Sequence, residues 1–128
     1  MPVPSVISVL DDDPYVRAAI SNLLKSRGYI VHTFASAEEF LRSTDSIDTS
    51  CVIADVQMPL MTGIDLLTQM RAEGSATPFI LITGFPDESV RARALEAGAT
   101  CFLGKPFAPT DMMRCLDRAL AADDETRG

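Results

Sequence analysis

The sequence predicts an α/β fold in which helices cover both faces of a five-stranded parallel sheet, a doubly wound architecture. Short apolar runs rich in β-branched residues alternate with longer segments in which apolar residues recur at helical spacing. Five such strand–helix pairs follow one another within 128 residues, which is an ordinary length for one domain. Strands joined by helices of this length must run parallel, with right-handed crossovers.

The first unit is a strand over residues 5–10 followed by a helix. A run of three acidic residues ends the strand, and the last of them, Asp13, can cap the helix. Pro14 suits the first helical position, because the N–H that proline lacks would have no helical partner there. Gly28 is expected to end the helix.

The next two units begin with strands over residues 29–34 and 51–54. Ser36 and Glu39 have the spacing of a capping box, which predicts the start of the second helix. The third strand is apolar until it meets Asp55, and a Pro- and Gly-rich turn follows it. Such a run is typical of a strand buried on both faces of a parallel sheet.

The rest of the chain completes the five units. A third helix ends at Gly74. The remaining expected elements are strand 79–83, helix 87–97, strand 100–103 and helix 109–122. We expect a single domain over residues 1–128 with an ordered core over about 5–122, and a tail, residues 123–128, that frays.

Composition narrows the classes of function. Hydrophobic residues make up 47% of the chain, so it is globular. The net charge of −7 argues against direct binding to a nucleic acid backbone. The apolar runs are too short to span a membrane, and the first residues lack the features of a secretory signal, so we expect a cytoplasmic protein.

Cysteine and histidine offer little chemistry. Cys51, Cys101 and Cys115 lack the spacing of metal ligands and are expected to be reduced, buried thiols. His32 is the only histidine, which excludes His-rich zinc sites and argues against a Ser-His-Asp triad.

Polar residues follow four of the strands, where parallel strands present their carboxyl ends to a common crevice. They are Asp11 and Asp12 after the first strand, Asp55 after the third, Thr83 in the fourth and Lys105 after the fifth. Clustered carboxylates repel one another, and Mg²⁺ or Ca²⁺, which prefer oxygen ligands, would remove that repulsion. The sequence therefore predicts a cation site with a lysine and a hydroxyl at its edge.

This set of groups suits phosphoryl transfer. A divalent cation and Lys105 can neutralise two phosphoryl oxygens, the Thr83 hydroxyl can bind a third, and Asp55 is the natural nucleophile. Each group alone has a simpler structural explanation. Asp13 would be a helix cap, Thr83 and Lys105 would lie in ordinary turns, and Phe102 would belong to the core. The functional interpretation rests on four strand ends of one sheet presenting what one reaction needs.

The motifs, taken together and in this order, resemble the receiver domain of response regulators in two-component signalling. The resemblance covers essentially the whole chain and looks strongest to the FixJ-type branch. It implies a flavodoxin-like receiver fold with strand order 2-1-3-4-5, and a cis Lys105–Pro106 bond. The motifs are Leu10-Asp11-Asp12-Asp13, Asp55-Val56-Gln57-Met58-Pro59 with Gly63, Leu81-Ile82-Thr83-Gly84, and Gly98-Ala99 through Phe102 to Lys105-Pro106-Phe107.

The resemblance implies a role for each matching position. Asp55 would accept a phosphoryl group from a histidine kinase or a phosphotransfer protein. Asp12, Asp55 and the backbone carbonyl of Gln57 would bind Mg²⁺, with Asp11 acting through water. Lys105 would contact the phosphoryl group and Asp55. The chain would then be a signalling domain that catalyses only its own phosphorylation and dephosphorylation.

The resemblance also implies a switch. The Thr83 hydroxyl would move toward the phosphoryl group, and the ring of Phe102 would fill the space that Thr83 leaves. The face formed by helix 87–97, strand 100–103 and helix 109–122 would change shape and control the output. A homodimer formed through this face after phosphorylation is a further expectation.

Two variable positions of the family would tune the lifetime of the phosphoryl group. Gln57 could orient an attacking water, whereas the bulky Phe85 could exclude one. We expect a fairly long-lived phosphoryl group.

Three alternatives compete with this interpretation. A phosphohydrolase of the haloacid-dehalogenase type needs an acid where this chain has Gln57. A flavodoxin-like FMN carrier needs a phosphate-binding loop where this chain has the acidic run that begins at Asp11. A standalone phosphoryl relay or sink, or a protein-binding adaptor, would keep the fold and act without an output domain. For a receiver domain, we expect that the output is made through a partner protein or by a fused domain outside this sequence.

Overall fold

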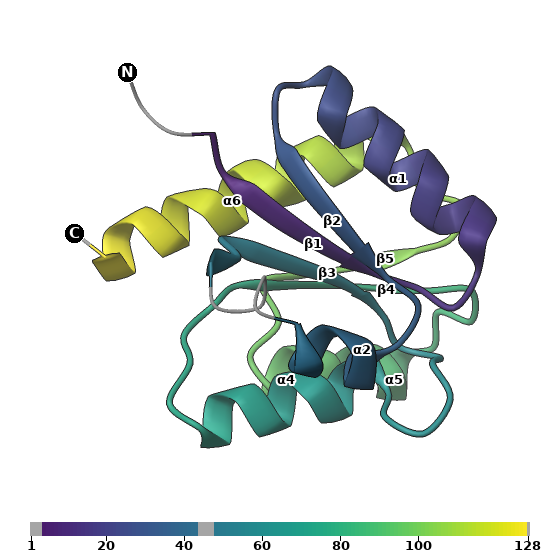
Figure 1. Ribbon diagram of the computed structural model, residues 1–128. Coiled ribbons are helices and arrows are strands. Elements are labelled where there is room, and N and C mark those ends of the chain that lie inside the picture. The colour runs from purple at the N-terminus through teal and green to yellow at the C-terminus, as the bar shows by residue number, and fades with distance from the viewer. Residues whose placement is uncertain (1–3, 44–47, 128) are drawn as a thin grey trace.

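The five strands form one parallel sheet in the order β2-β1-β3-β4-β5. The computed structural model describes residues 4–43 and 48–127, of which 122–127 are described by their backbone alone (Figure 1). The predicted strand order is confirmed. The strands are β1 (Val6–Leu10), β2 (Ile30–Phe34), β3 (Cys51–Asp55), β4 (Phe79–Thr83) and β5 (Cys101–Gly104).

Helices cover both faces of the sheet, as the sequence predicted (Figure 1). One face carries α1 (Pro14–Ser26) and α6 (Pro109–Arg127). The other face carries α2 (Ala37–Arg42), α4 (Gly63–Ala72) and α5 (Glu88–Glu96). Among the described residues, no helix combines the length and the apolar character that a membrane crossing needs.

Two apolar cores result from the alternation of side chains along the central strands. Ile53 and Ile80 face the core shared with α1 and α6. Val52 and Leu81 face the core shared with α2, α4 and α5. All residues of β3 and β4 are buried, which fixes the positions of the side chains that end these strands.

Short polar side chains set the starts of the helices. Asp13 caps α1, as predicted, and its carboxylate accepts a hydrogen bond from the N–H of Tyr15 at 2.9 Å. Ser36 caps α2 through the N–H of Glu39 at 3.1 Å. The return contact of Glu39 goes to the N–H of Ala35, one residue before the cap. A full capping box forms instead at the start of α4.

Two boundaries differ from the expectation. Asp55 is the last residue of β3 and not the residue that follows it, because Val56 continues the backbone hydrogen bonding to Ile82 at 2.8 Å. The backbone of α6 continues to Arg127, beyond the expected end at residue 122. Neither proline nor glycine interrupts residues 110–127, so the helical backbone has no local reason to end earlier.

Candidate functional site

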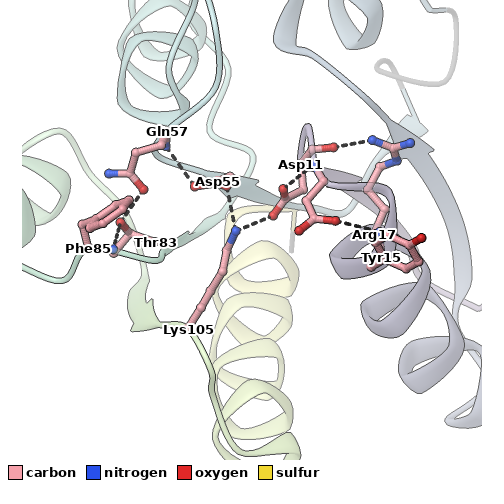
Figure 2. Close-up of polar contacts among 9 residues, drawn as sticks. Asp11, Tyr15, Arg17, Asp55, Gln57, Thr83, Phe85 and Lys105 are labelled. Atoms are coloured by element: carbon pink, nitrogen blue, oxygen red, sulfur yellow. Dashed lines mark hydrogen bonds and ion pairs between the residues drawn. The ribbon is translucent and has the colours of Figure 1, made fainter.

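The carboxyl ends of four strands meet at one edge of the sheet and bring the predicted polar side chains together (Figure 2). Asp11 follows β1, Asp55 ends β3, Thr83 ends β4 and Lys105 follows β5. The strands are parallel and adjacent in the order β1-β3-β4-β5, so this edge presents all four side chains to the same side. The predicted convergence is therefore present in the fold.

Lys105 bridges two buried carboxylates at the centre of this edge. Its Nζ donates to Asp11 Oδ2 and to Asp55 Oδ2, each at 2.8 Å. The Asp11 and Asp55 side chains are 0% and 5% exposed, against 20% for Lys105. Burial alone would lower the pKa of Lys105, but the hydrogen bonds from its ammonium group to the two carboxylates outweigh it and raise the pKa above the usual value.

Asp11 is held by several contacts besides the lysine. Its Oδ1 accepts the N–H of Asp13 at 2.9 Å, and its backbone carbonyl accepts Arg17 Nη1 at 2.6 Å. Burial raises the pKa of Asp11 above its usual value, although the hydrogen bonds from Lys105 and from the Asp13 backbone oppose that shift. The charged form of Asp11 is thus costly without positive charge nearby.

The exposed Asp12 completes an acidic cluster with Asp11 and Asp55. One oxygen from each of the three carboxylates lies within 4.8 Å of the other two. Lys105 supplies one positive charge against three negative charges, so the cluster retains a surplus of negative charge. Hard oxygen ligands with net negative charge fit Mg²⁺ or Ca²⁺. The donor set therefore suits the predicted divalent cation.

The Thr83 hydroxyl is engaged in two hydrogen bonds beside the acidic cluster. It donates to Gln57 Oε1 and accepts the N–H of Phe85 at 3.0 Å (Figure 2). The N–H of Gln57 in turn donates to Asp55 Oδ1 at 2.9 Å. Gln57 thus joins the candidate nucleophile to the candidate switch hydroxyl, a link that no sequence pattern predicts.

The remaining predicted site residues lie outside the acidic cluster. Phe102 is a partly buried residue of β5, packed against the core shared with α2, α4 and α5, and its backbone is paired with Leu81. The ring of Phe85 is 75% exposed on the loop after β4. The Lys105–Pro106 bond is cis, as expected.

Two features of the site could not be identified as such from the sequence. Arg17 lies one turn into α1, and nothing in its spacing indicates that it reaches the Asp11 carbonyl. Leu60 has a φ of 69° and a side chain that is 94% exposed, in the loop between β3 and α4. Gly63, by contrast, belongs to the sequence motif that begins at Asp55. A Cβ atom there would lie 2.6 Å from the Asp55 carbonyl oxygen, so the glycine lets α4 approach the end of β3.

An apolar groove adjoins the acidic cluster on the side of α1. Its volume is about 460 Å³, and Lys105 lies at its edge. The other lining residues are Val16, Ala19, Ile20, Leu23, Pro106, Phe107 and Pro109. The site therefore combines an acidic cluster with a neighbouring apolar groove large enough for side chains of another protein.

Comparisons of the sequence and of the structure with known proteins agree with one another. The family model described as response regulator receiver domain matches residues 7–117. The response regulator protein TodT of Pseudomonas putida is 37% identical over 123 residues, which are 96% of this chain and 54% of TodT. The transcriptional regulatory protein FixJ of Bradyrhizobium diazoefficiens is 36% identical over 114 residues, which are 89% of this chain and 56% of FixJ.

The crystal structure of FixJ-N is similar to this fold with a TM-score of 0.85 at 30% identity, covering 94% of this chain and 96% of that one. The chain spans about half the length of the curated relatives it matches.

Proposed function

This chain belongs to the response regulator receiver domain family, and from that premise we propose that Asp55 takes a phosphoryl group from a histidine kinase or phosphotransfer protein, with Mg²⁺ as cofactor. One observation carries the proposal: Asp55, at the end of a buried strand, shares Lys105 with Asp11 beside the exposed Asp12. Three carboxylates and one lysine at a single edge serve no packing purpose, but they suit a site that receives phosphate and a divalent cation.

The chemistry at Asp55 is an in-line displacement. A carboxylate oxygen of Asp55 attacks the phosphorus of the donor, the new P–O bond forms, and the P–N bond to the donor imidazole breaks. Lys105 Nζ, already 2.8 Å from Asp55 Oδ2, is placed to neutralise charge on the phosphoryl oxygens. The Gln57 N–H, 2.9 Å from Asp55 Oδ1, holds the carboxylate in one orientation.

The donor set of the acidic cluster fits the proposed cofactor. Asp12, Asp55 and the backbone carbonyl of Gln57 would hold Mg²⁺, with Asp11 acting through water. When bound, the ion would supply positive charge to the transferring phosphoryl group.

Signalling would follow from competition for the Thr83 hydroxyl. That hydroxyl now donates to Gln57 Oε1, and a phosphoryl group on Asp55 offers a more strongly charged acceptor. Turning of the Thr83 hydroxyl toward the phosphoryl group would break its hydrogen bond to Gln57 and open space for the ring of Phe102. The face formed by α5, β5 and α6 would then change shape, which is the proposed output signal.

The side chain of Phe85 supports a fairly long phosphoryl lifetime. Once the Thr83 hydroxyl has turned to the phosphoryl group, Gln57 Oε1 is free to orient an attacking water, so the proposed lifetime rests on Phe85. Phe85, 75% exposed at the rim, offers no polar group to such a water. Slow loss of the phosphoryl group from wild type, accelerated in Phe85→Glu, is the expected result. Rapid loss that slows in Phe85→Glu would contradict it.

The partners follow from the surface and from the family. The apolar groove between α1 and the segment after β5 would receive a helix of the phosphodonor protein, next to Lys105. The curated relatives are regulators about twice as long as this chain, so they do not favour a standalone relay or an adaptor. We propose that output acts through a partner protein, a fused domain or a homodimer formed through the α5-β5-α6 face.

Beryllofluoride with Mg²⁺ tests the site and the switch together, because it mimics an acyl phosphate on an aspartate. Titration of the isotope-labelled chain should shift amide resonances around Asp55, Thr83 and Phe102. Asp55→Asn should abolish the shifts while its circular dichroism stays that of wild type. Shifts that survive in Asp55→Asn would contradict the proposal, as would their absence from a folded wild type.

A further inference from the structure

Two buried thiols lie between β5 and α6, away from the acidic cluster. Cys101 is the first residue of β5, and Cys115 lies in α6. Their residues are 6% and 8% exposed, and both belong to the core shared with α1 and α6. The thiol of Cys115 shares a hydrogen bond with the sulfur of Cys101. The proposed phosphoryl transfer uses neither of them.

A second donor points at the same sulfur. Arg118 Nη1, one turn after Cys115 in α6, lies 3.7 Å from Cys101 Sγ. Burial raises the pKa of Cys115 to about 12, and its hydrogen bond with Cys101 acts in the same direction. Cys115 therefore keeps its proton, and the guanidinium of Arg118 lies beside the sulfur of Cys101, which makes Cys101 the candidate attacking sulfur.

Both cysteines line one small cavity. Its volume is about 240 Å³, and its lining includes Cys101, Cys115 and Arg118 together with Phe102. Hydrogen peroxide is little larger than water and fits such a space. The third cysteine, Cys51, is fully buried in β3 and does not line this cavity. Two of the three buried cysteines thus line the cavity, and Cys51 serves as a cysteine outside it for comparison.

We propose that Cys101 and Cys115 form a redox-active pair that hydrogen peroxide converts into an intramolecular disulfide, tethering β5 to α6. The Cys101 thiolate attacks one peroxide oxygen, the O–O bond breaks, and sulfenic acid and hydroxide form. The Cys115 sulfur then attacks the sulfenic sulfur, its S–O bond breaks, and the departing hydroxide takes the Cys115 proton as water. Peroxide gains two electrons, and the two thiols together lose two.

The tether would lie within the face that contains α5, β5 and α6, and Cys101 is the direct neighbour of Phe102. A reversible cross-link there would give the chain a second covalent input besides the proposed phosphoryl group. The disulfide needs neither Asp55 nor a phosphodonor. Its test therefore succeeds or fails independently of the proposed function.

The experiment treats the full chain with hydrogen peroxide, counts free thiols after unfolding, and maps cross-linked peptides by mass spectrometry. Two of the three thiols should disappear, with one cross-linked pair of peptides joining residues 101 and 115, and dithiothreitol should restore both thiols. Cys51→Ser should give the same cross-link. Three retained thiols, a cross-link to Cys51, a covalent dimer or sulfinic acid without a cross-link would each overturn the proposal.

Two further variants test the assignment of Cys101 as the attacking sulfur. Cys115→Ser should stop at sulfenic acid, which dimedone labels on Cys101; a label on Cys51 would overturn the assignment. Arg118→Gln should slow peroxide oxidation several-fold, because it removes a donor from the Cys101 sulfur. Arg93→Gln removes the same charge from α5, outside the lining of this cavity, and should keep the wild-type rate. Equal rates in the two arginine variants would refute the role of Arg118.

Discussion

Replacing Asp12 by asparagine should stabilise the fold and remove most of its response to Mg²⁺. The substitution keeps the shape of the side chain and removes one of three carboxylates whose oxygens lie within 4.8 Å of one another. Lys105 already contacts the other two, Asp11 and Asp55, at 2.8 Å each. Asp12 is therefore the carboxylate whose repulsion has the least local compensation.

The magnitude follows from the separation of the charges. Two unit charges about 4.8 Å apart repel by about 1 kcal/mol in water and by about 3 kcal/mol at an effective dielectric constant of about 20. Asp12 is exposed, so the lower value applies to each of its two pairs, and the lysine and dissolved salt offset part of it. We expect the free energy of unfolding to rise by about 1 kcal/mol without divalent cations.

The assay is urea denaturation in low salt, with EDTA and then with Mg²⁺. Wild type should gain about 3 kcal/mol when Mg²⁺ reaches about 100 times its dissociation constant, and Asp12→Asn should gain much less. Asp13→Asn is the matched control. It removes the same charge one residue away, outside the cluster, and asparagine still caps α1. If the two variants respond alike to EDTA and Mg²⁺, the reasoning is refuted.

Three further predictions concern packing, strain and switching. Gly63→Ala should lower the free energy of unfolding by about 1–3 kcal/mol in chemical denaturation, because the new Cβ would lie 2.6 Å from the Asp55 carbonyl oxygen. Gly84→Ala, where a Cβ would meet open space, should change the free energy of unfolding little. Equal effects of the two substitutions would contradict this account. Leu60→Gly should raise the free energy of unfolding by about 1 kcal/mol, because glycine adopts the φ of 69° without strain and the lost side chain is 94% exposed. A loss of stability would show that the Leu60 side chain contributes to packing. Phe102→Ala should still accept phosphate on Asp55 but lose the change in the α5-β5-α6 face, as followed by amide resonances; an unchanged response would remove Phe102 from the switch.

The fold could be predicted from the sequence, and so could the edge of the sheet where the site lies. Both follow from the periodicity of apolar residues and from the direction of the strands. Buried runs such as residues 79–83 alternate with helical patterns, and these units have few ways to pack. Once the strands are parallel, residues at their carboxyl ends must share one edge. Asp55 and Lys105, 50 residues apart, are therefore placed together by the sequence pattern alone.

The features that escaped prediction depend on tertiary contacts or on weak local signals. The reach of Arg17 to the Asp11 carbonyl depends on the packing of α1 against the sheet. The capping box of α4 is formed by Thr62 and Asp65. Its acid is an aspartate where the usual capping-box pattern has glutamate or glutamine, so that pattern does not predict it. The hydrogen bond between Gln57 and Thr83 joins the loop after β3 to the end of β4, and periodicity carries no information about it.

Mass spectrometry after incubation with acetyl phosphate tests the central claim most directly, because a small donor removes any dependence on the cognate kinase. With Mg²⁺, wild type should gain one phosphoryl group that maps to Asp55, and this gain should be lost in EDTA and in Asp55→Asn. A folded wild type that stays unmodified, or a phosphoryl group that persists in Asp55→Asn, would contradict the account.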